Sequence, residues 1–495
     1  MATVDELKKI RLKKLEAIER AGLLVYPSKI KRTHTVSEAL ENFEDLSQSQ
    51  KEVVLVGRIR SLREHGGSTF LHIEDGSARS TSSGQAKIQA YFKKDKLGEK
   101  GYKFFLDNFD IGDFIEVRGV LFQTKKGERT IEVADFKMLA KSLLPLPEKW
   151  HGLKDIEERF RKRYLDLIFN PEVKKKFEIR SAIIKEIRNF MDGKGFLEVE
   201  TPTLQPIYGG ASAKPFKTHL NALDMTLYLR IAPELYLKRL LVGGIEKVYE
   251  LGKCFRNEGM DRSHNPEYTH FEFYWAYSDY KDVMNLTEEM FESVIRKTSG
   301  KLEVDYEGKK INFKSPWPRV EFNQLLKKYA EVDFFEINEA AIKKEAKKLG
   351  VETEKEDGKA EVADKIFKKY CQAKIWDPTF VIHHPVESKP LAKALEKDSS
   401  KSANLQLIVA GWELINAYSE ENNPIKQKKK FEKQEKLFES GLKEAQRIDK
   451  DYIEALEYGM PPAAGFGLGI DRLVALLTDS HSLREVILFP TMRPK

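Results

Sequence analysis

The sequence predicts an α+β protein in which a small five-stranded barrel precedes a larger domain of helices and antiparallel strands. Three observations support this prediction. The chain has 495 residues, which is too long for a single hydrophobic core. Five short β-like runs follow one another over about 90 residues of the N-terminal third. From about residue 171 onward, helical patterns mix with strand-like runs.

The N-terminal part of the chain is predicted to contain charged helices and then the barrel. Residues 1–45 read as one or two charged helices, and residues 46–142 carry the β runs. These runs are VVLVGRIRSLR, STFLHIEDG, AKIQAYF, DFIEVRGVLFQT and RTIEVADFKML. Five strands separated by glycine and charged turns favour an OB-fold, a barrel that commonly binds oligonucleotides on its face. The alternative is a barrel that only packs against its neighbour.

The rest of the chain divides into a connector and the larger domain. Residues 143–172 contain prolines and a basic run, and they read as a linker that enters a helical pattern. Residues 173–495 form the expected α+β domain. Within it, residues 321–372 are dense in Lys, Glu and Ala at helical spacing, which predicts a helical insertion.

Composition restricts the class of protein. The net charge of +7 is compatible with a nucleic-acid partner without establishing one. No apolar stretch is long enough to span a bilayer, and the N-terminus has no apolar secretory core, so no membrane association is expected. The two cysteines, Cys254 and Cys371, are too few for a disulfide framework or a cysteine-based zinc site. This fits a reduced cytosol, and we expect a cytoplasmic protein.

Three segments of the larger domain carry candidate chemistry, although the sequence has no Walker-type phosphate loop. The first, FEIRSAIIKEIRNFMDGKGFLEVETPTL, reads as a helix followed by a strand that ends at Pro202. The third, GFGLGIDRLVALLT, places glycines before a helix that starts near Asp471, where the backbone can approach a ligand closely. Arg472 lies in the first turn of that helix. Its alternative role is a surface ion pair.

The second segment, KVYELGKCFRNEGMDRSHNPEYTHFEFYWAY, reads as a strand, a loop and a strand. Its polar and aromatic residues include Arg256, Glu258, His264, Asn265, Tyr268, Glu272 and Tyr274. The planar guanidinium of Arg256 suits a carboxylate or a phosphate. An exposed charged hairpin is the alternative, and the density of polar and aromatic side chains argues against it.

Taken together, the three segments resemble motifs 1, 2 and 3 of the class II aminoacyl-tRNA synthetases. GGASAKPFKTHLNALDMTLYLRIAPELYLKRLLVGG, HNPEYTHFEFYWAY, INAYSEENNP and REVILFPTMRPK further resemble the bacterial type of lysyl-tRNA synthetase, in subclass IIb. The resemblance covers nearly the whole chain. It implies a catalytic domain built on an antiparallel sheet flanked by helices. It also implies a homodimer that activates L-lysine with ATP and transfers it to the 3′-terminal adenosine of tRNA(Lys).

The resemblance assigns the ATP contacts and the catalytic arginines. Arg256 is expected to bridge the lysine carboxylate and the α-phosphate of ATP. Arg472 is expected to contact the γ-phosphate and flank the adenine. The remaining nucleotide contacts that it implies are Glu258, His264, Asn265 and Tyr268.

The resemblance also assigns a lysine pocket. Glu234 and the backbone at Gly210 are expected to receive the α-amino group, and Glu272, Tyr274 and Glu420 to enclose the ε-ammonium. Arg256, Asn416 and Tyr418 complete the predicted set. This placement is chemically reasonable, because a buried cation needs paired carboxylates to offset its desolvation and a hydroxyl oxygen to accept hydrogen bonds from its remaining N–H groups.

Two further sites follow from the resemblance. A magnesium ion on the ATP phosphates is expected at Glu413 and Gln406, and Gln406 departs from the glutamate that family members usually carry there. We expect LQLIVAGWELIN to form a hairpin that puts both residues on one face. The alternative is that Gln406 only packs against the sheet. In the barrel, Phe70, Gln89 and Glu128 match anticodon-reading positions. For Phe70, a role in the barrel core is the alternative.

Three rival functions remain open at this point. An enzyme of the same subclass for aspartate or asparagine is opposed by Glu272 and Glu420, because those substrates need a cationic or amide-reading pocket. A lysyl-transferase that modifies a protein is opposed by the predicted barrel. A non-catalytic RNA-binding module is opposed by the pair Arg256 and Arg472, because such a module needs no ATP clamp.

Overall fold

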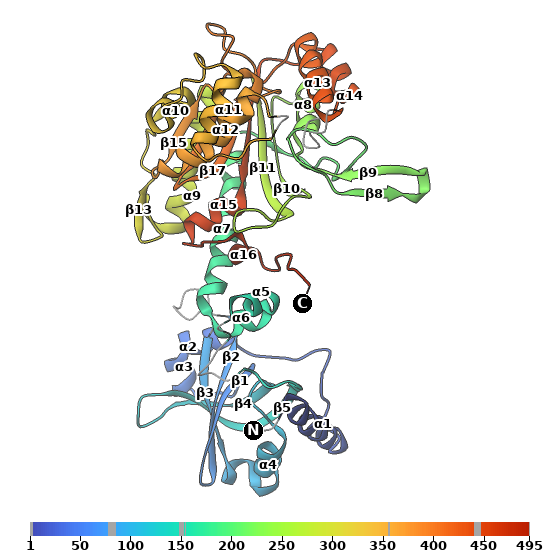
Figure 1. The fold of residues 1–495 in the computed structure, drawn as a ribbon. Coiled ribbons are helices and arrows are strands. Elements are labelled where there is room, and N and C mark those ends of the chain that lie inside the picture. Colours follow the sequence, from blue (N-terminus) through green and yellow to red (C-terminus); the bar gives the residue numbers. More distant parts are fainter. Residues whose placement is uncertain are drawn as a thin grey trace. The chain divides into compact units, whose positions relative to one another are not determined.

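The chain folds as two compact units, Met1–Lys175 and Lys176–Lys495 (Figure 1). The computed structural model describes residues 3–77, 86–147, 153, 155–354, 357–439 and 447–494. The first unit contains a closed barrel and the second an eight-stranded sheet with helices, which confirms the predicted α+β class. The finer domain limits, at residues 45, 142 and 172, stay predictions.

The barrel is built from the five predicted strands. They are β1 (Val53–His65), β2 (Ser68–Asp75), β3 (Ala86–Lys93), β4 (Phe114–Gln123) and β5 (Arg129–Ala140), closed in the order β1-β2-β3-β5-β4. Alternate residues of β2 and β3 are buried, so that side chains such as Leu71 and Ile88 fill the interior. The residues between them point outward and form the face on which the predicted anticodon residues lie.

The helices of the first unit precede, interrupt or follow the barrel strands along the chain. They are α1 (Val4–Arg20), α2 (Val36–Glu41), α3 (Phe43–Gln48), α4 (Lys94–Asn108), α5 (Ile156–Arg161) and α6 (Arg163–Phe169). The sequence reading did not predict α4, which contributes Phe105 to the barrel core. Helix α7 (Pro171–Gly193) then carries the chain from the first unit into the second.

The large sheet of the second unit has the order β14-β15-β16-β17-β18-β11-β10-β6. Its strands are β6 (Leu197–Glu198), β10 (Lys247–Phe255), β11 (Glu267–Ala276), β14 (Arg319–Glu321), β15 (Thr379–Ile382), β16 (Asn404–Val409), β17 (Trp412–Ser419) and β18 (Ala463–Gly469). Neighbouring strands are antiparallel except in the pairs β14–β15 and β10–β6. One face of the sheet packs with α7, α9 (Tyr280–Ser299) and α15 (Ile470–Leu477) in the largest apolar core of the described chain.

The strand predicted to run up to Pro202 is much shorter than expected. Only Leu197 and Glu198 pair with β10, at the edge of the sheet. Beyond them, the backbone N–H and the hydroxyl of Thr201 both donate to the Glu250 carboxylate instead of to a neighbouring strand. A side chain therefore replaces the ladder partner, and the regular pairing stops.

The remaining elements lie around this sheet. Residues 321–372 contain α10 (Phe322–Ala330), α11 (Glu339–Lys348) and α12 (Lys359–Tyr370), which share their own apolar cluster. The others are β7 (Leu204–Gln205), β8 (Lys217–Leu220), β9 (Met225–Leu229), β12 (Glu303–Tyr306), β13 (Lys309–Asn312), α8 (Glu234–Val242), α13 (Pro424–Glu439), α14 (Lys450–Glu457) and α16 (Leu483–Val486). Figure 1 shows the β8–β9 hairpin projecting away from the large sheet. Within the described ranges, no helix is long and apolar enough to cross a membrane.

Candidate active site

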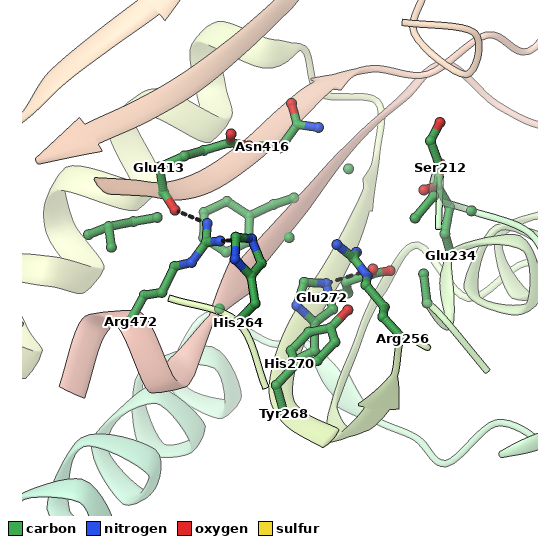
Figure 2. Close-up of a pocket in the computed structure, with 18 of the residues that line it drawn as sticks. Ser212, Glu234, Arg256, His264, Tyr268, His270, Glu272, Glu413, Asn416 and Arg472 are labelled. Atoms are coloured by element: carbon green, nitrogen blue, oxygen red, sulfur yellow. Dashed lines mark hydrogen bonds and ion pairs between the residues drawn. The ribbon is translucent and has the colours of Figure 1, made fainter. Parts of the chain in front are cut away.

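A cavity of about 350 Å³ gathers most of the predicted site residues in the second unit (Figure 2). Its wall comes from β11, β17 and β18, the loop after β10, and the first turns of α8 and α15. The predicted lysine and ATP residues in this wall are Gly210, Glu234, Arg256, Glu258, His264, Asn265, Tyr268, Glu272, Tyr274, Asn416, Tyr418 and Arg472. Of the two predicted metal ligands, Glu413 lines the cavity and Gln406 does not.

Strand β11 shows how the sequence builds this wall. Tyr268, Glu272 and Tyr274 line the cavity at a spacing of two residues or a multiple of it. The intervening Phe271 and Phe273 are buried in the apolar core on the other face. The alternation of polar and apolar side chains in HFEFYW therefore places the site on one face of the sheet and the core on the other.

Strand β18 runs between β11 and β17 and contributes little more than backbone. Its Gly465 pairs with Tyr274 on one side and Tyr418 on the other. A Cβ at Gly465 would lie 2.5 Å from Tyr274 Cε1 and would also meet Glu420 Oε1. A glycine is therefore required if Tyr274 and Glu420 are to keep their present positions.

One end of the cavity is acidic. Tyr418 donates a hydrogen bond of 2.6 Å to Glu234 Oε1, and Tyr274 donates one of 3.2 Å to Glu272 Oε2. Glu420 lies against Gly465 and is 1% exposed. Its Oε2 is 2.5 Å from the Nζ of the buried Lys238, and its Oε1 accepts no hydrogen bond from a described residue. Burial raises the pKa of Glu234 and that of Glu420, as is usual for carboxyl groups that lose contact with water.

The other end of the cavity carries arginine and histidine. The Arg472 guanidinium donates to the Glu413 backbone carbonyl at 2.7 Å, and its Nη2 lies 3.5 Å from His264 Nε2. Figure 2 shows these three residues on one side of the cavity and Glu234 on the other. Arg256 lies in the wall with its guanidinium 5.2 Å from the centre of the Tyr268 ring.

The hairpin predicted around Gln406 and Glu413 is present. Strands β16 and β17 turn at Ala410 and Gly411, both of which have positive φ angles (47° and 76°). Gln406 pairs with Asn416, and Glu413 is opposite Ile408, so Gln406 and Glu413 share a face.

The donor set for a metal ion is small. Gln406 is 4% exposed and contacts the buried His384 rather than the cavity. Among the residues that the structure describes, no group of three or more His, Cys, Asp or Glu side chains could hold a metal. Magnesium bound through phosphates needs only one or two protein carboxylates, so Glu413 fits that role as a single ligand.

Two stretches of the chain also match known sequence families. Residues 155–493 match the family of class II tRNA synthetases for D, K and N, and residues 53–139 match the OB-fold nucleic acid binding domain. A lysine–tRNA ligase of Carboxydothermus hydrogenoformans is 50% identical over 493 residues, which are 99% of both chains. The chain belongs to the lysine–tRNA ligases. Proteins of the same name from Pelotomaculum thermopropionicum and Thermosipho melanesiensis are 49% and 45% identical, each over 99% of this chain and 96% of their own.

The barrel brings the three predicted anticodon residues near one another. Phe70 on β2 stacks on Tyr91 of β3, with ring centres 4.6 Å apart. Gln89 pairs with His72 in the ladder, and Glu128 Oε1 lies 3.5 Å from His72 Nε2. Phe70 alternates with the buried Leu71, so it lies on the outer face of the barrel and not in its core. Its role in reading an anticodon stays a prediction.

Sequence reasoning missed two lysines at or beside the cavity. Lys389 lines the cavity, and its pKa is lowered by burial against the opposing effect of the nearby Glu413 carboxylate. Lys389 lies in no predicted strand and in no motif, so nothing in the sequence indicated its place in the site. Lys238 is fully buried and contacts Glu234. For this lysine a signal existed, since a Glu and a Lys four residues apart on a helix are neighbours.

Proposed function

We propose that this chain is a lysine–tRNA ligase that first joins L-lysine and ATP into lysyl-adenylate, releasing diphosphate. It then transfers the lysyl group to the 3′-terminal adenosine of tRNA(Lys). The observation that carries this proposal is a cavity with the buried carboxylates of Glu234 and Glu272 in its wall at one end and arginines elsewhere in the wall. The buried Glu420 does not line the cavity but lies against Gly465 of its wall. Family membership indicates the class of reaction, and the negative charge at one end of the cavity supports lysine as the amino acid.

The first step needs no protein nucleophile. A lysine carboxylate oxygen attacks the α-phosphorus, a new O–P bond forms, and the bond to the β-phosphate oxygen breaks as diphosphate leaves. Catalysis is then a matter of alignment and charge stabilisation. Arg256 lies between the acidic side and the Arg472 side of the cavity (Figure 2), where it can contact the carboxylate and the α-phosphate together. Its Nε is buried without a partner among the described residues, and a bound anion would satisfy it.

The acidic end accounts for the choice of lysine. The substrate's two ammonium groups lose water on entry, and carboxylates must replace that hydration. Glu234, close to Gly210, is assigned to the α-amino group, while Glu272 and Glu420 are assigned to the ε-ammonium. Aspartate or asparagine would bring a carboxylate or an amide to these same acids, with no cation to offset them.

Magnesium is the metal we assign to the phosphate end, with Glu413 as its protein ligand. When bound, it neutralises phosphate charge and orients the triphosphate. Arg472 and His264 would bind the phosphates directly, and Arg472 is in turn fixed by its hydrogen bond to the Glu413 carbonyl. Tyr268 presents its ring beside Arg256, where an adenine can stack.

The OB-fold unit is assigned to the anticodon of tRNA(Lys), through the outer face that carries Phe70, Gln89 and Glu128. The row of Phe70 and Tyr91 offers a stacking platform for an unpaired base. A homodimer that forms through α7 and the segment after it, and a cytoplasmic location, complete the proposal. The homodimer and the location are both proposed from the family alone.

The test is amino-acid-dependent exchange of labelled diphosphate into ATP, run with each of the twenty amino acids. Lysine alone should drive strong exchange without tRNA. Glu272→Gln should raise the KM for lysine, whereas Glu267→Gln, an exposed position on the same strand that lines no part of the cavity, should not. Exchange driven by aspartate or asparagine instead of lysine would overturn the proposal. Charging of tRNA transcripts with labelled lysine then tests the second step.

A further inference from the structure

Lys238 is a buried cation directly behind the acidic end of the cavity. It lies on α8, one turn after Glu234, and its side chain is 0% exposed. Its Nζ lies 2.5 Å from Glu234 Oε1 and 2.5 Å from Glu420 Oε2. The ring centres of Tyr274, Tyr418 and Tyr452 lie 5.7, 5.5 and 6.0 Å from it. Lys238 does not line the cavity, so it does not occupy the place of the substrate.

We propose that Lys238 is a positioning residue for lysine recognition, an internal cation that holds Glu234 and Glu420 ionised and in place for the substrate's ammonium groups. This inference rests on the assignment of the acidic end to lysine. It adds a residue that acts through the two carboxylates and does not touch the substrate.

The geometry divides each carboxylate between Lys238 and the cavity. Glu234 uses Oε1 for Lys238 and Tyr418, while its Oε2 faces Gly210, at 3.5 Å from where a Cβ would stand. Glu420 uses Oε2 for Lys238, and its Oε1 lies against Gly465, free of any hydrogen bond from a described residue. One oxygen of each group is thus held in place by Lys238. The other Glu234 oxygen is left for a ligand in the cavity, and the other Glu420 oxygen lies against Gly465 of the cavity wall.

The charges at this end then match those of lysine. With Glu234, Glu272 and Glu420 ionised, as this inference requires, and His270 beside Glu272 neutral, the carboxylates bring three negative charges. Lys238 and Arg256 bring two positive ones, so the empty site carries one net negative charge. Lysine at neutral pH carries one net positive charge, and the occupied site is neutral. Without Lys238 the site would carry two negative charges in a buried place, and one carboxyl group would take up a proton instead. A protonated carboxyl no longer attracts an ammonium group.

Other titratable groups lie near Lys238 on the elements packed against it. They are His270, Glu272 and Tyr274 on β11, Tyr418 on β17, Tyr452 and Asp449 at α14, and Lys430 on α13. Glu272 Oε1 lies 2.9 Å from His270 Nε2. Asp449 pairs with Arg239, and Lys430 pairs with Glu421. Burial raises the pKa of each tyrosine, so the tyrosines stay neutral near pH 7. Removing Lys238 therefore leaves Glu234 and Glu420 without their shared cation.

The test is Lys238→Met in lysine-dependent diphosphate exchange, measured as a function of pH. We expect the KM for lysine to rise at least about ten-fold, with the KM for ATP changed less than about two-fold. Once the cation is gone, the pKa values of the carboxyl groups rise, and these groups take up protons at a higher pH. The pH below which the KM for lysine increases, the acid limb of the profile, should therefore shift upward by at least about one pH unit. Lys238→Arg, which keeps the charge, should leave the limb in place.

Lys430→Met is the matched control, because it removes a partly buried, ion-paired lysine from a neighbouring helix. An acid limb that does not move in Lys238→Met, or that moves equally in Lys430→Met, overturns the inference. If Lys238→Met does not fold, Lys238→Met combined with Glu420→Gln restores the charge count. That protein should fold and bind lysine weakly, and the acid limb of its KM profile should lie at the wild-type pH. A shifted acid limb would contradict the inference. Absence of lysine-dependent exchange in the wild type would instead refute the proposed function.

Discussion

Gly465→Ala is the substitution whose effect follows most directly from the geometry of the site. The added methyl group would stand 2.5 Å from Tyr274 Cε1 and 2.9 Å from Cδ1. Carbon atoms in contact prefer about 3.5–4.0 Å, so the ring must retreat by about 1 Å. The Tyr274 hydroxyl, which donates to Glu272 at 3.2 Å, moves with the ring. Glu420 Oε1, which the methyl group also meets, must move as well.

The effect should therefore fall on lysine and spare ATP. Overpacking of this kind costs about 1–3 kcal/mol, and a misplacement of about 1 Å at a binding site can cost about 100-fold. We expect kcat/KM for lysine in diphosphate exchange to fall about 30- to 100-fold, with the KM for ATP within about three-fold of wild type. Gly101→Ala is the control, since its Cβ would meet nothing closer than 3.9 Å in helix α4. Unchanged lysine kinetics in Gly465→Ala would show that Tyr274 and Glu420 do not shape the pocket.

The remaining predictions concern the two reaction steps and the metal. Arg256→Ala and Arg472→Ala should each reduce adenylate formation by at least about 100-fold in a protein with an unchanged melting temperature, and near-normal exchange would remove that arginine from the site. Phe70→Ala should spare exchange and weaken tRNA charging by about 1–3 kcal/mol, whereas equal loss in both assays would indicate a structural role. Because Gln406 lies outside the cavity wall and contacts His384, Gln406→Glu should leave the magnesium concentration for half-maximal exchange unchanged, and a lower concentration would show that this position does sense the metal.

The sequence was most informative where one periodicity served both packing and function. In β11, apolar residues alternate with Tyr268, Glu272 and Tyr274, so the strand, its buried face and its site face could be predicted together. The turn at Ala410 and Gly411 was equally readable, because a glycine in a short turn between two apolar runs favours a tight hairpin. In both places the signal is local and does not depend on distant partners.

The sequence was least informative where a residue's position depends on segments far away in the chain. Lys238 is fully buried only because Glu420, almost two hundred residues later, and Glu234 both contact it. Helix α4 was missed because Gly98, with a φ of 73°, interrupts its pattern. Gln406 lies on the predicted face, but its contact with His384 keeps it out of the cavity wall, and no local pattern predicts that contact.

The charges of the cavity also explain why both substrates can be held close enough to react. The lysine carboxylate and the α-phosphate are both anions, so bringing them together is unfavourable unless a cation lies between them. In the proposed mechanism, the acidic end attracts the ammonium groups and turns the carboxylate toward Arg256. Arg472 and Lys389, on the Glu413 side, would attract the triphosphate from the opposite direction. On this proposal the two anions meet at Arg256, where burial would strengthen the guanidinium's interaction with both.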